Sequence, residues 1–417
     1  MLDPYSRLLT ALIILATGCA EQHTRALKLG PQTPFIAAPI ISPVPNTAIG
    51  QRLVALPDGR LSVAWWQNLP HAKSNLKISS LEGEKWTTAK TITDMPNIAD
   101  AHIAAINEDS MSAMWMASKP YKAGGEVQDI YTSTANLSDN RWSKPLKVNQ
   151  EKETSGKMLP AFTASQDGSL IAAWIDVPVS QPIPPDSPKA TAENEPTTSL
   201  DIARISPDNT VVKRISAVKT FCGCCPPALT TDVQDALLVY RGLEPVNVRD
   251  PAIIHITQDK PSAPRTIHND NWVFDGCPSS GPVIAVQQNT VAVAWTTMVN
   301  NMMIVRAAFS EENGRHFAAP IDVELENATT VSGIAMESAH SALVVWTGSG
   351  SKGEMIKLAR VFADGRIEHR TTAHTLTSGG GYKWPGPRMV KTNDSVIVGW
   401  HDEQGMKVGL TKIKVNE

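Results

Sequence analysis

The sequence lacks a long hydrophobic run and has no excess of charge of one sign. Beyond residue 16, no stretch approaches the roughly 18 consecutive apolar residues of a membrane-spanning helix. The 38 Lys and Arg residues nearly balance the 41 Asp and Glu residues, which gives a formal net charge of −3. A nucleic-acid-binding protein usually carries a basic stripe, so we expect no nucleic acid as a partner.

The apolar stretch at the N-terminus has the features of an export signal. Residues 8–16, LLTALIILA, are too short to span a bilayer and have the length of a signal-peptide core. The following Ala16-Thr17-Gly18-Cys19 resembles the lipobox of bacterial lipoproteins, whose cysteine is lipidated. This resemblance implies a signal peptide over residues 1–18 and a membrane anchor at Cys19, followed by a tether over residues 19–33. The residue after the cysteine is Ala and not Asp, which points to the outer membrane and a protein that faces the periplasm.

Short apolar strands that end in an aromatic residue recur along the chain, as in LSVAWW, MSAMWM and VAVAWT. The aromatic residues are Trp65, Trp115, Trp174, Tyr240, Trp295, Trp346 and Trp400. Their spacing ranges from 50 residues (Trp65 to Trp115) to 66 residues (Trp174 to Tyr240). A strand that recurs at this period is typical of the blades of a β-propeller. We expect all seven aromatic residues in the core, between neighbouring blades.

Each repeat contains an apolar strand, a turn, the aromatic-ended strand and two further strands. The pattern predicts an all-β fold, a β-propeller of four-stranded antiparallel blades, with seven blades favoured over six. The last repeat ends after its third strand, so the N-terminal segment PFIAAPIIS, residues 34–42, is expected to supply the fourth and close the ring. Residues 34–417 would then form one domain, with a Pro-, Ser- and Glu-rich surface loop at 177–199.

Four cysteines remain once Cys19 is set aside, an even number that suits disulfides in an oxidising compartment. Three of them, Cys222, Cys224 and Cys225, lie in FCGCCPPAL, and Cys277 lies in DGCPSSGP. One interpretation is two structural disulfides. One disulfide would join Cys277 to one of the other three cysteines, and the second would be local.

The same cluster admits two other interpretations, a soft-metal site and a reactive thiol. Thiolates from two loops bind Cu(I) or Zn(II), so copper or zinc at these four cysteines is the cofactor hypothesis. Methionines would favour Cu(I), although methionines in strands are usually core residues. Those expected on the same side are Met298, Met302 and Met303. For a reactive thiol, Arg241, Arg249 and Lys383 are candidates to lower its pKa.

Two stretches carry a family resemblance. Residues 310–317, SEENGRHF, resemble the Asp-box turn of sialidase-like (BNR-repeat) propellers, with Glu312 in place of the Asp. Residues 221–317 also resemble a group of exported bacterial sialidase-like proteins that share a Cys-x-Cys-Cys motif. An Asp-box is a peripheral turn, so the resemblance bears on the fold and not on the activity.

If the protein is an enzyme, the resemblance implies a sialidase-type glycoside hydrolase. Such enzymes hold the substrate carboxylate with three arginines and use a Tyr nucleophile and an Asp acid/base. Their Arg-Ile-Pro motif is absent from this sequence. The candidate arginines are Arg52, Arg241, Arg249 and Arg388, and the other candidates are Tyr382 and Asp250.

Propeller topology places the loops that enter the inner strands on one face, together with the loops that follow the second strands. The cysteine loops lie on this face, around the mouth of the central channel. Candidate ligand-binding residues there are Glu244, Trp272, Lys383 and His401, with Trp272 as an aromatic contact. We therefore expect a propeller that binds a small-molecule, glycan or protein ligand without turnover. A sialidase-type hydrolase and a copper- or thiol-handling protein are the alternatives.

Overall fold

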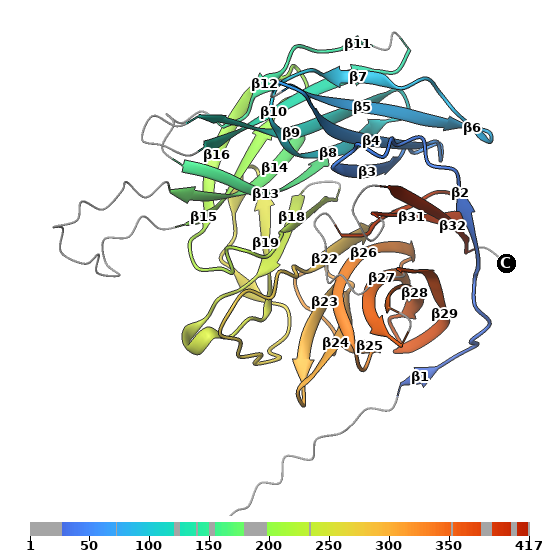
Figure 1. Ribbon diagram of the computed structural model, residues 1–417. Coiled ribbons are helices and arrows are strands. Elements are labelled where there is room, and N and C mark those ends of the chain that lie inside the picture. Colours follow the sequence, from blue (N-terminus) through green and yellow to red (C-terminus); the bar gives the residue numbers. More distant parts are fainter. Residues whose placement is uncertain are drawn as a thin grey trace, which may run out of the picture.

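The computed structural model describes residues 27–71, 73–120, 126–138, 141–149, 155–178, 198–232, 235–351, 353–376, 386–401 and 407–415. Within these ranges the chain forms strands and one short 3-10 helix, Pro245–Asn247. The strands pair into seven small sheets, arranged as blades around an axis (Figure 1). The predicted seven-bladed all-β propeller is confirmed.

The blades follow one another along the chain. Blade one contains β3 (Gly50–Ala55), β4 (Leu61–Leu69), β5 (Lys73–Glu82), β6 (Lys85–Trp86) and β7 (Lys90–Thr93). Blade two contains β8 (Ile98–Asn107), β9 (Ser110–Pro120), β10 (Glu126–Asn136), β11 (Arg141–Trp142) and β12 (Leu146–Lys147). Blade three contains β13 (Ser155–Ala164), β14 (Leu170–Pro178), β15 (Ser199–Ile205) and β16 (Val211–Val218).

Blade four contains β17 (Ala228–Thr231), β18 (Asp235–Arg241), β19 (Pro251–Thr257), β20 (Lys260–Pro261) and β21 (Arg265–Thr266). Blade five contains β22 (Val283–Gln287), β23 (Thr290–Val299), β24 (Met302–Ser310) and β25 (Ile321–Glu324). Blade six contains β26 (Ala328–Ser338), β27 (Ser341–Gly350), β28 (Gly353–Phe362) and β29 (Arg366–Thr375). Blade seven contains β30 (Arg388–Lys391), β31 (Ser395–His401) and β32 (Val408–Lys414).

The N-terminal segment adds one strand to each of the last two blades (Figure 1). Strand β2 (Ile36–Ile40) pairs antiparallel with β32, from Ile36 opposite Lys414 to Ile40 opposite Leu410. This is the ring closure expected from the incomplete seventh repeat. Strand β1 (Lys28–Leu29) pairs in parallel with β29 of blade six. Two residues that the sequence placed in the tether therefore belong to a sheet edge.

The hydrophobic core consists of clusters that each join two neighbouring blades. One cluster packs Trp346 with residues of blades five and six. Another packs Trp65 against Val408 and Leu410, and thereby joins blade one to blade seven. All seven aromatic residues predicted to be core are buried. Because a buried aromatic side chain removes about 150–250 Å² from water, these residues account for much of the blade-to-blade adhesion.

Two predicted surface features lie at the periphery. Residues 310–317 connect β24 to β25, and the Ser310 hydroxyl accepts the backbone N–H of Gly314 at 3.0 Å. Of the predicted insertion, residues 177–178 end β14 and residues 198–199 lead into β15, while 179–197 lie outside the described residues. Within the described ranges, no helix has the length and apolar character needed to cross a membrane.

Candidate functional site at the cysteine loops and the channel mouth

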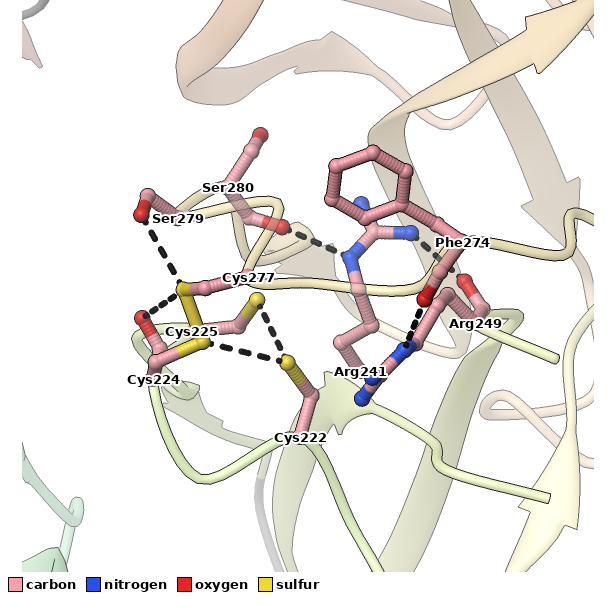
Figure 2. The surroundings of a disulfide bond; sticks show 9 residues. All are labelled: Cys222, Cys224, Cys225, Arg241, Arg249, Phe274, Cys277, Ser279 and Ser280. Atoms are coloured by element: carbon pink, nitrogen blue, oxygen red, sulfur yellow. Dashed lines mark hydrogen bonds between the residues drawn. A yellow bond between two sulfur atoms is a disulfide. The ribbon is translucent and has the colours of Figure 1, made fainter. Parts of the chain in front are cut away.

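The cysteines lie on two loops of adjacent blades. Cys222, Cys224 and Cys225 lie on the loop that leads into β17 of blade four, and Cys277 lies on the loop that leads into β22 of blade five. Cys224 and Cys277 form a disulfide between residues 53 positions apart (Figure 2). The expected pairing of Cys277 with one of the clustered cysteines is present, and it ties the two blades together.

The second expected disulfide is not formed, which corrects the prediction of two. Cys222 and Cys225 are free and buried, and their Sγ atoms lie 3.0 Å apart. The backbone N–H of Cys225 donates to the carbonyl of Cys222 at 3.2 Å, which closes a turn. Four cysteines allow three connectivities, and only the folded backbone selects among them. The feature of the sequence that marks this pair is the Cys-x-x-Cys spacing of residues 222 and 225, which is the spacing of dithiol redox motifs.

The two loops pack backbone against backbone. The α-carbon of Gly281 lies so near the carbonyl oxygen of Pro226 that a Cβ atom there would sit 1.8 Å from that oxygen. Only glycine permits this approach. The contact and the disulfide therefore fix the two loops relative to each other at two points.

Arg241 connects three segments of this region through hydrogen bonds. Its side chain is buried, with 1% of its surface exposed. The guanidinium donates to the carbonyls of Ser280 (2.7 Å), Arg249 (2.7 Å) and Thr296 (2.8 Å). All three guanidinium nitrogens thus bind backbone oxygens, and Arg241 is placed to hold loops together and not to face a ligand.

Trp272 is not the exposed aromatic contact that the sequence suggested. It is 5% exposed, lies 5.5 Å from Phe274 in a stacked pair, and has the Arg241 guanidinium over its ring at 5.0 Å. Phe221, the aromatic residue directly before Cys222, is also buried, with 6% of its surface exposed. Polar neighbours in the sequence made the Trp272 segment look like a surface loop, but long-range partners bury the ring.

The charged residues of the loop between β18 and β19 form hydrogen bonds with neighbouring segments. Asp250 is buried and accepts the backbone N–H groups of Asn271 (3.0 Å) and Trp272 (3.2 Å), while Arg249 Nε donates to the carbonyl of Phe274 at 3.2 Å. Burial raises the pKa of Asp250, although the two N–H donors oppose this effect. Glu244 is exposed and accepts a hydrogen bond from Thr266 at 3.3 Å.

The pKa values of the two buried thiols shift in opposite directions. The hydrogen bond from Cys225 lowers the pKa of Cys222 to about 6, with further help from the Arg249 and Arg241 cations, although burial opposes this shift. The same hydrogen bond, together with burial, raises the pKa of Cys225. The contact between the two sulfur atoms therefore favours the charged form of Cys222 and the protonated form of Cys225. Arg241 interacts electrostatically with both of these cysteines and also with the carboxylates of Asp270 and Asp250.

A cavity of about 260 Å³ lies at the axis of the ring and is lined by the inner strands. Arg52, His102 and Arg388 line it from blades one, two and seven, and Pro226 and Gly281 line it from blades four and five. The cysteine loops therefore border this cavity directly, since Pro226 follows Cys225 in the chain. Of the four candidate arginines, two line the cavity.

The cavity wall has a defined charge arrangement. Arg52 donates to Asp100 at 2.7 Å, and His102 Nε2 lies 3.5 Å from Arg52. Burial is the largest effect and favours the neutral form of Asp100, but Arg52, His102 and Arg388 together hold the Asp100 pKa below its ordinary value. Burial, together with Arg52, lowers the pKa of His102 to about 4. At neutral pH, two guanidinium groups therefore face one carboxylate and a neutral imidazole.

The remaining candidates are dispersed. His401 ends β31 in blade seven, which does not adjoin blades four and five. Met303 packs against the core between blades five and six, and Met302 is 45% exposed at the β23–β24 turn. Met298 lies half-buried on the same hairpin, opposite Met303. Cys19, Tyr382 and Lys383 lie outside the described residues.

No protein-family model and no curated protein matches this sequence. Solved structures that resemble it include a Hadza microbial sialidase (10% identity, TM-score 0.44, 72% of this chain and 64% of that chain). They also include an ulvan lyase (9% identity, TM-score 0.49, 76% and 79%) and a mutant of Trypanosoma rangeli sialidase with trans-sialidase activity (9% identity, TM-score 0.47, 93% and 57%). This chain spans less than two thirds of the length of either sialidase. At such identities and TM-scores, the similarities carry no conclusion about activity.

Proposed function

We propose that this protein binds a small anionic ligand at the mouth of its central channel, on the face that carries the cysteine loops. The observation that supports this proposal is that Arg52 and Arg388 line one cavity at the ring axis. Propeller channels are common ligand sites because loops from all blades converge there.

The charge of the cavity selects for an anion. Among the described residues at the cavity wall, Arg52 and Arg388 contribute two positive charges, Asp100 contributes one negative charge, and His102 is neutral. A guanidinium binds a carboxylate or a sulfate in a bidentate manner. The volume of about 260 Å³ suits one acidic monosaccharide or a ligand of similar size.

A sialidase-type hydrolase is less well supported. That chemistry requires three arginines around one carboxylate, but Arg241 is bound by three backbone carbonyls and Arg249 bonds the carbonyl of Phe274. The candidate nucleophile Tyr382 lies outside the described residues. We therefore propose binding without turnover, and release of sugar from a sialoside would instead favour the hydrolase.

The proposal includes export and anchoring through Cys19 at the outer membrane, facing the periplasm. It rests on the resemblance of residues 16–19 to a lipobox. Membrane fractionation of the full chain tests it. We expect the chain in the outer-membrane fraction and the Cys19→Ala chain in the soluble periplasmic fraction. An unmodified N-terminal peptide that retains residues 1–18 would contradict the proposal.

Ligand binding can be tested by calorimetry on the secreted Cys19→Ala chain. The probes are N-acetylneuraminic, glucuronic and galacturonic acids, each compared with its neutral counterpart. We expect Arg388→Gln to weaken binding of the acidic sugar about tenfold, the equivalent of one lost charge-assisted contact. The matched control is Arg60→Gln, because Arg60 is exposed, pairs with Asp58 and is not among the residues that line the cavity. Equal binding of the neutral sugar, or no effect of Arg388→Gln, would contradict the proposal.

A further inference from the structure

Successive contacts link the four sulfur atoms in the order Cys225, Cys222, Cys224 and Cys277 (Figure 2). Cys225 Sγ lies 3.0 Å from Cys222 Sγ, which in turn lies 3.5 Å from Cys224 Sγ. Cys224 is bonded to Cys277. Cys222 and Cys225 are each 2% exposed, whereas Cys277 is exposed. A buried dithiol therefore contacts the inner sulfur of a disulfide whose outer sulfur is exposed to solvent.

The geometry favours Cys222, in the middle of this series of contacts, as the nucleophile. Thiol–disulfide exchange begins with attack of a thiolate on a disulfide sulfur. Cys222 Sγ contacts both Cys225 Sγ (3.0 Å) and the disulfide sulfur of Cys224 (3.5 Å), so this thiol already touches the sulfur that it would attack. The Cys225 sulfur contacts Cys222 in turn, so each of the two exchange steps has its partner sulfur already in contact.

We propose that these cysteines form a thiol–disulfide relay, in which the buried Cys222–Cys225 dithiol reduces an external disulfide through the exposed Cys224–Cys277 pair. This activity is independent of the proposed anion site. An external disulfide cannot reach the buried thiols directly, so the exposed sulfur of Cys277 is the point of contact.

The internal steps conserve atoms and electrons. Cys222 thiolate attacks Cys224 Sγ, the Cys222–Cys224 bond forms, and Cys277 leaves as a thiolate. Cys225 then attacks Cys222 Sγ and gives up its proton, the Cys222–Cys225 bond forms, and Cys224 leaves and takes up that proton. One disulfide is present before and after, so no external oxidant is needed. The disulfide has moved from the surface to the interior, and a reduced pair is now exposed.

In the second half of the relay, the external disulfide accepts the electrons. Cys277 thiolate attacks one of its sulfurs, forms a mixed disulfide and releases the other sulfur as a thiolate. Cys224 then attacks Cys277 Sγ, which restores the Cys224–Cys277 disulfide and releases the second thiol. The external disulfide has gained two electrons and the Cys225 proton, and its second proton comes from solvent, because Cys222 reacted as a thiolate. The Cys222–Cys225 pair has become a disulfide.

The test measures thiols released from two probes, oxidised glutathione and a peptide cyclised by one disulfide. The soluble Cys19→Ala chain is the background for all variants. After acid quench and alkylation, peptide mass mapping locates the disulfides. We expect the chain with all four cysteines to release two thiols from the external disulfide and to end with both Cys222–Cys225 and Cys224–Cys277. Faster reduction of one probe shows whether a peptide or a small-molecule disulfide is the better substrate.

Two variants separate the steps. Cys225→Ser retains the first exchange only, so we expect one released thiol per chain and a stable mixed disulfide at Cys277. Cys222→Ser removes the first nucleophile, so we expect no release and a protected Cys277. Melting temperatures close to that of the parent show that the variants are folded. If Cys222→Ser does not fold, the test of the relay is the release of one thiol per chain by Cys225→Ser. Two thiols released by either variant, or no reduction of either probe by the parent chain, would overturn the relay.

Discussion

The α-carbon of Gly281 lies against the carbonyl oxygen of Pro226, at a distance where a Cβ atom would be 1.8 Å from that oxygen. Pro226 follows Cys225 and Gly281 follows Ser280, whose carbonyl accepts from Arg241. This single backbone contact therefore couples the cysteine loop, the Cys277 loop and the cavity wall. Even the methyl group of an alanine at position 281 would therefore disturb the site.

Gly281→Ala should accordingly disrupt the site. We expect a loss of roughly 2 kcal/mol or more in the free energy of unfolding, because backbone atoms must move to relieve the clash. The measurement is urea unfolding followed by tryptophan fluorescence. The matched control is Gly223→Ala in the same loop, where the nearest atom, on Thr198, lies 3.6 Å from the added Cβ. Equal losses in the two variants would show that the Pro226 contact does not limit packing.

Replacement of Arg241 by Gln should act on stability and not on ligand binding alone. The change leaves at least two buried carbonyls without a donor, and each such group costs about 1–3 kcal/mol. We expect a loss of several kcal/mol in urea unfolding, together with slower reaction of Cys222 with small alkylating reagents, because a cation near the thiolate is lost. Arg60→Gln serves as the comparison, because Arg60 is exposed, and it should leave the stability within about 1 kcal/mol. A stable Arg241→Gln that only loses ligand would instead place Arg241 in the binding site.

The fold could be predicted because each blade repeats the same physical requirement. An inner strand covered on both faces needs an apolar run, and a blade interface needs a large side chain, so Trp115, Trp174 and Trp295 recur at the blade period. Ring closure followed from the same pattern, since β32 had no outer neighbour until β2 was added. These features are local or periodic in the sequence.

The site was less predictable because contacts between distant residues determine it. Trp272 lies in a polar segment, but the Arg241 cation from β18 covers its ring. The single disulfide depends on which sulfur lies beside Cys277 once blades four and five are packed. That the four cysteines lie on one face could be predicted, because the propeller topology alone determines which loops meet.

Acid should destabilise the protein through His102. Its folded pKa is lowered to about 4, below the unfolded value of about 6.5. Between these values the unfolded chain binds a proton that the folded chain does not, so the free energy of unfolding falls as the pH decreases from 6.5 to 4. We expect His102→Gln to reduce this loss by roughly 2–3 kcal/mol, measured as urea unfolding at pH 7 and pH 4.5. His340→Gln is the control, because His340 is exposed. An unchanged pH dependence in His102→Gln would contradict this assignment.

The oxidation state of the cysteines should decide whether a metal binds. With one disulfide, the Cys19→Ala chain should have a mass about 2 Da below that of the reduced chain, because one disulfide removes two hydrogens. Reduction frees Cys224, and the sulfurs of Cys222, Cys224 and Cys225 then lie within 4.8 Å of one another, close enough to share one ion. We expect the reduced chain and Cys277→Ser to take up one Cu(I) against a competing chelator, and the oxidised chain to take up none. Cu(I) bound equally by the oxidised chain would show that Cys222 and Cys225 suffice as ligands, and a dithiol occupied by metal would not be available for exchange.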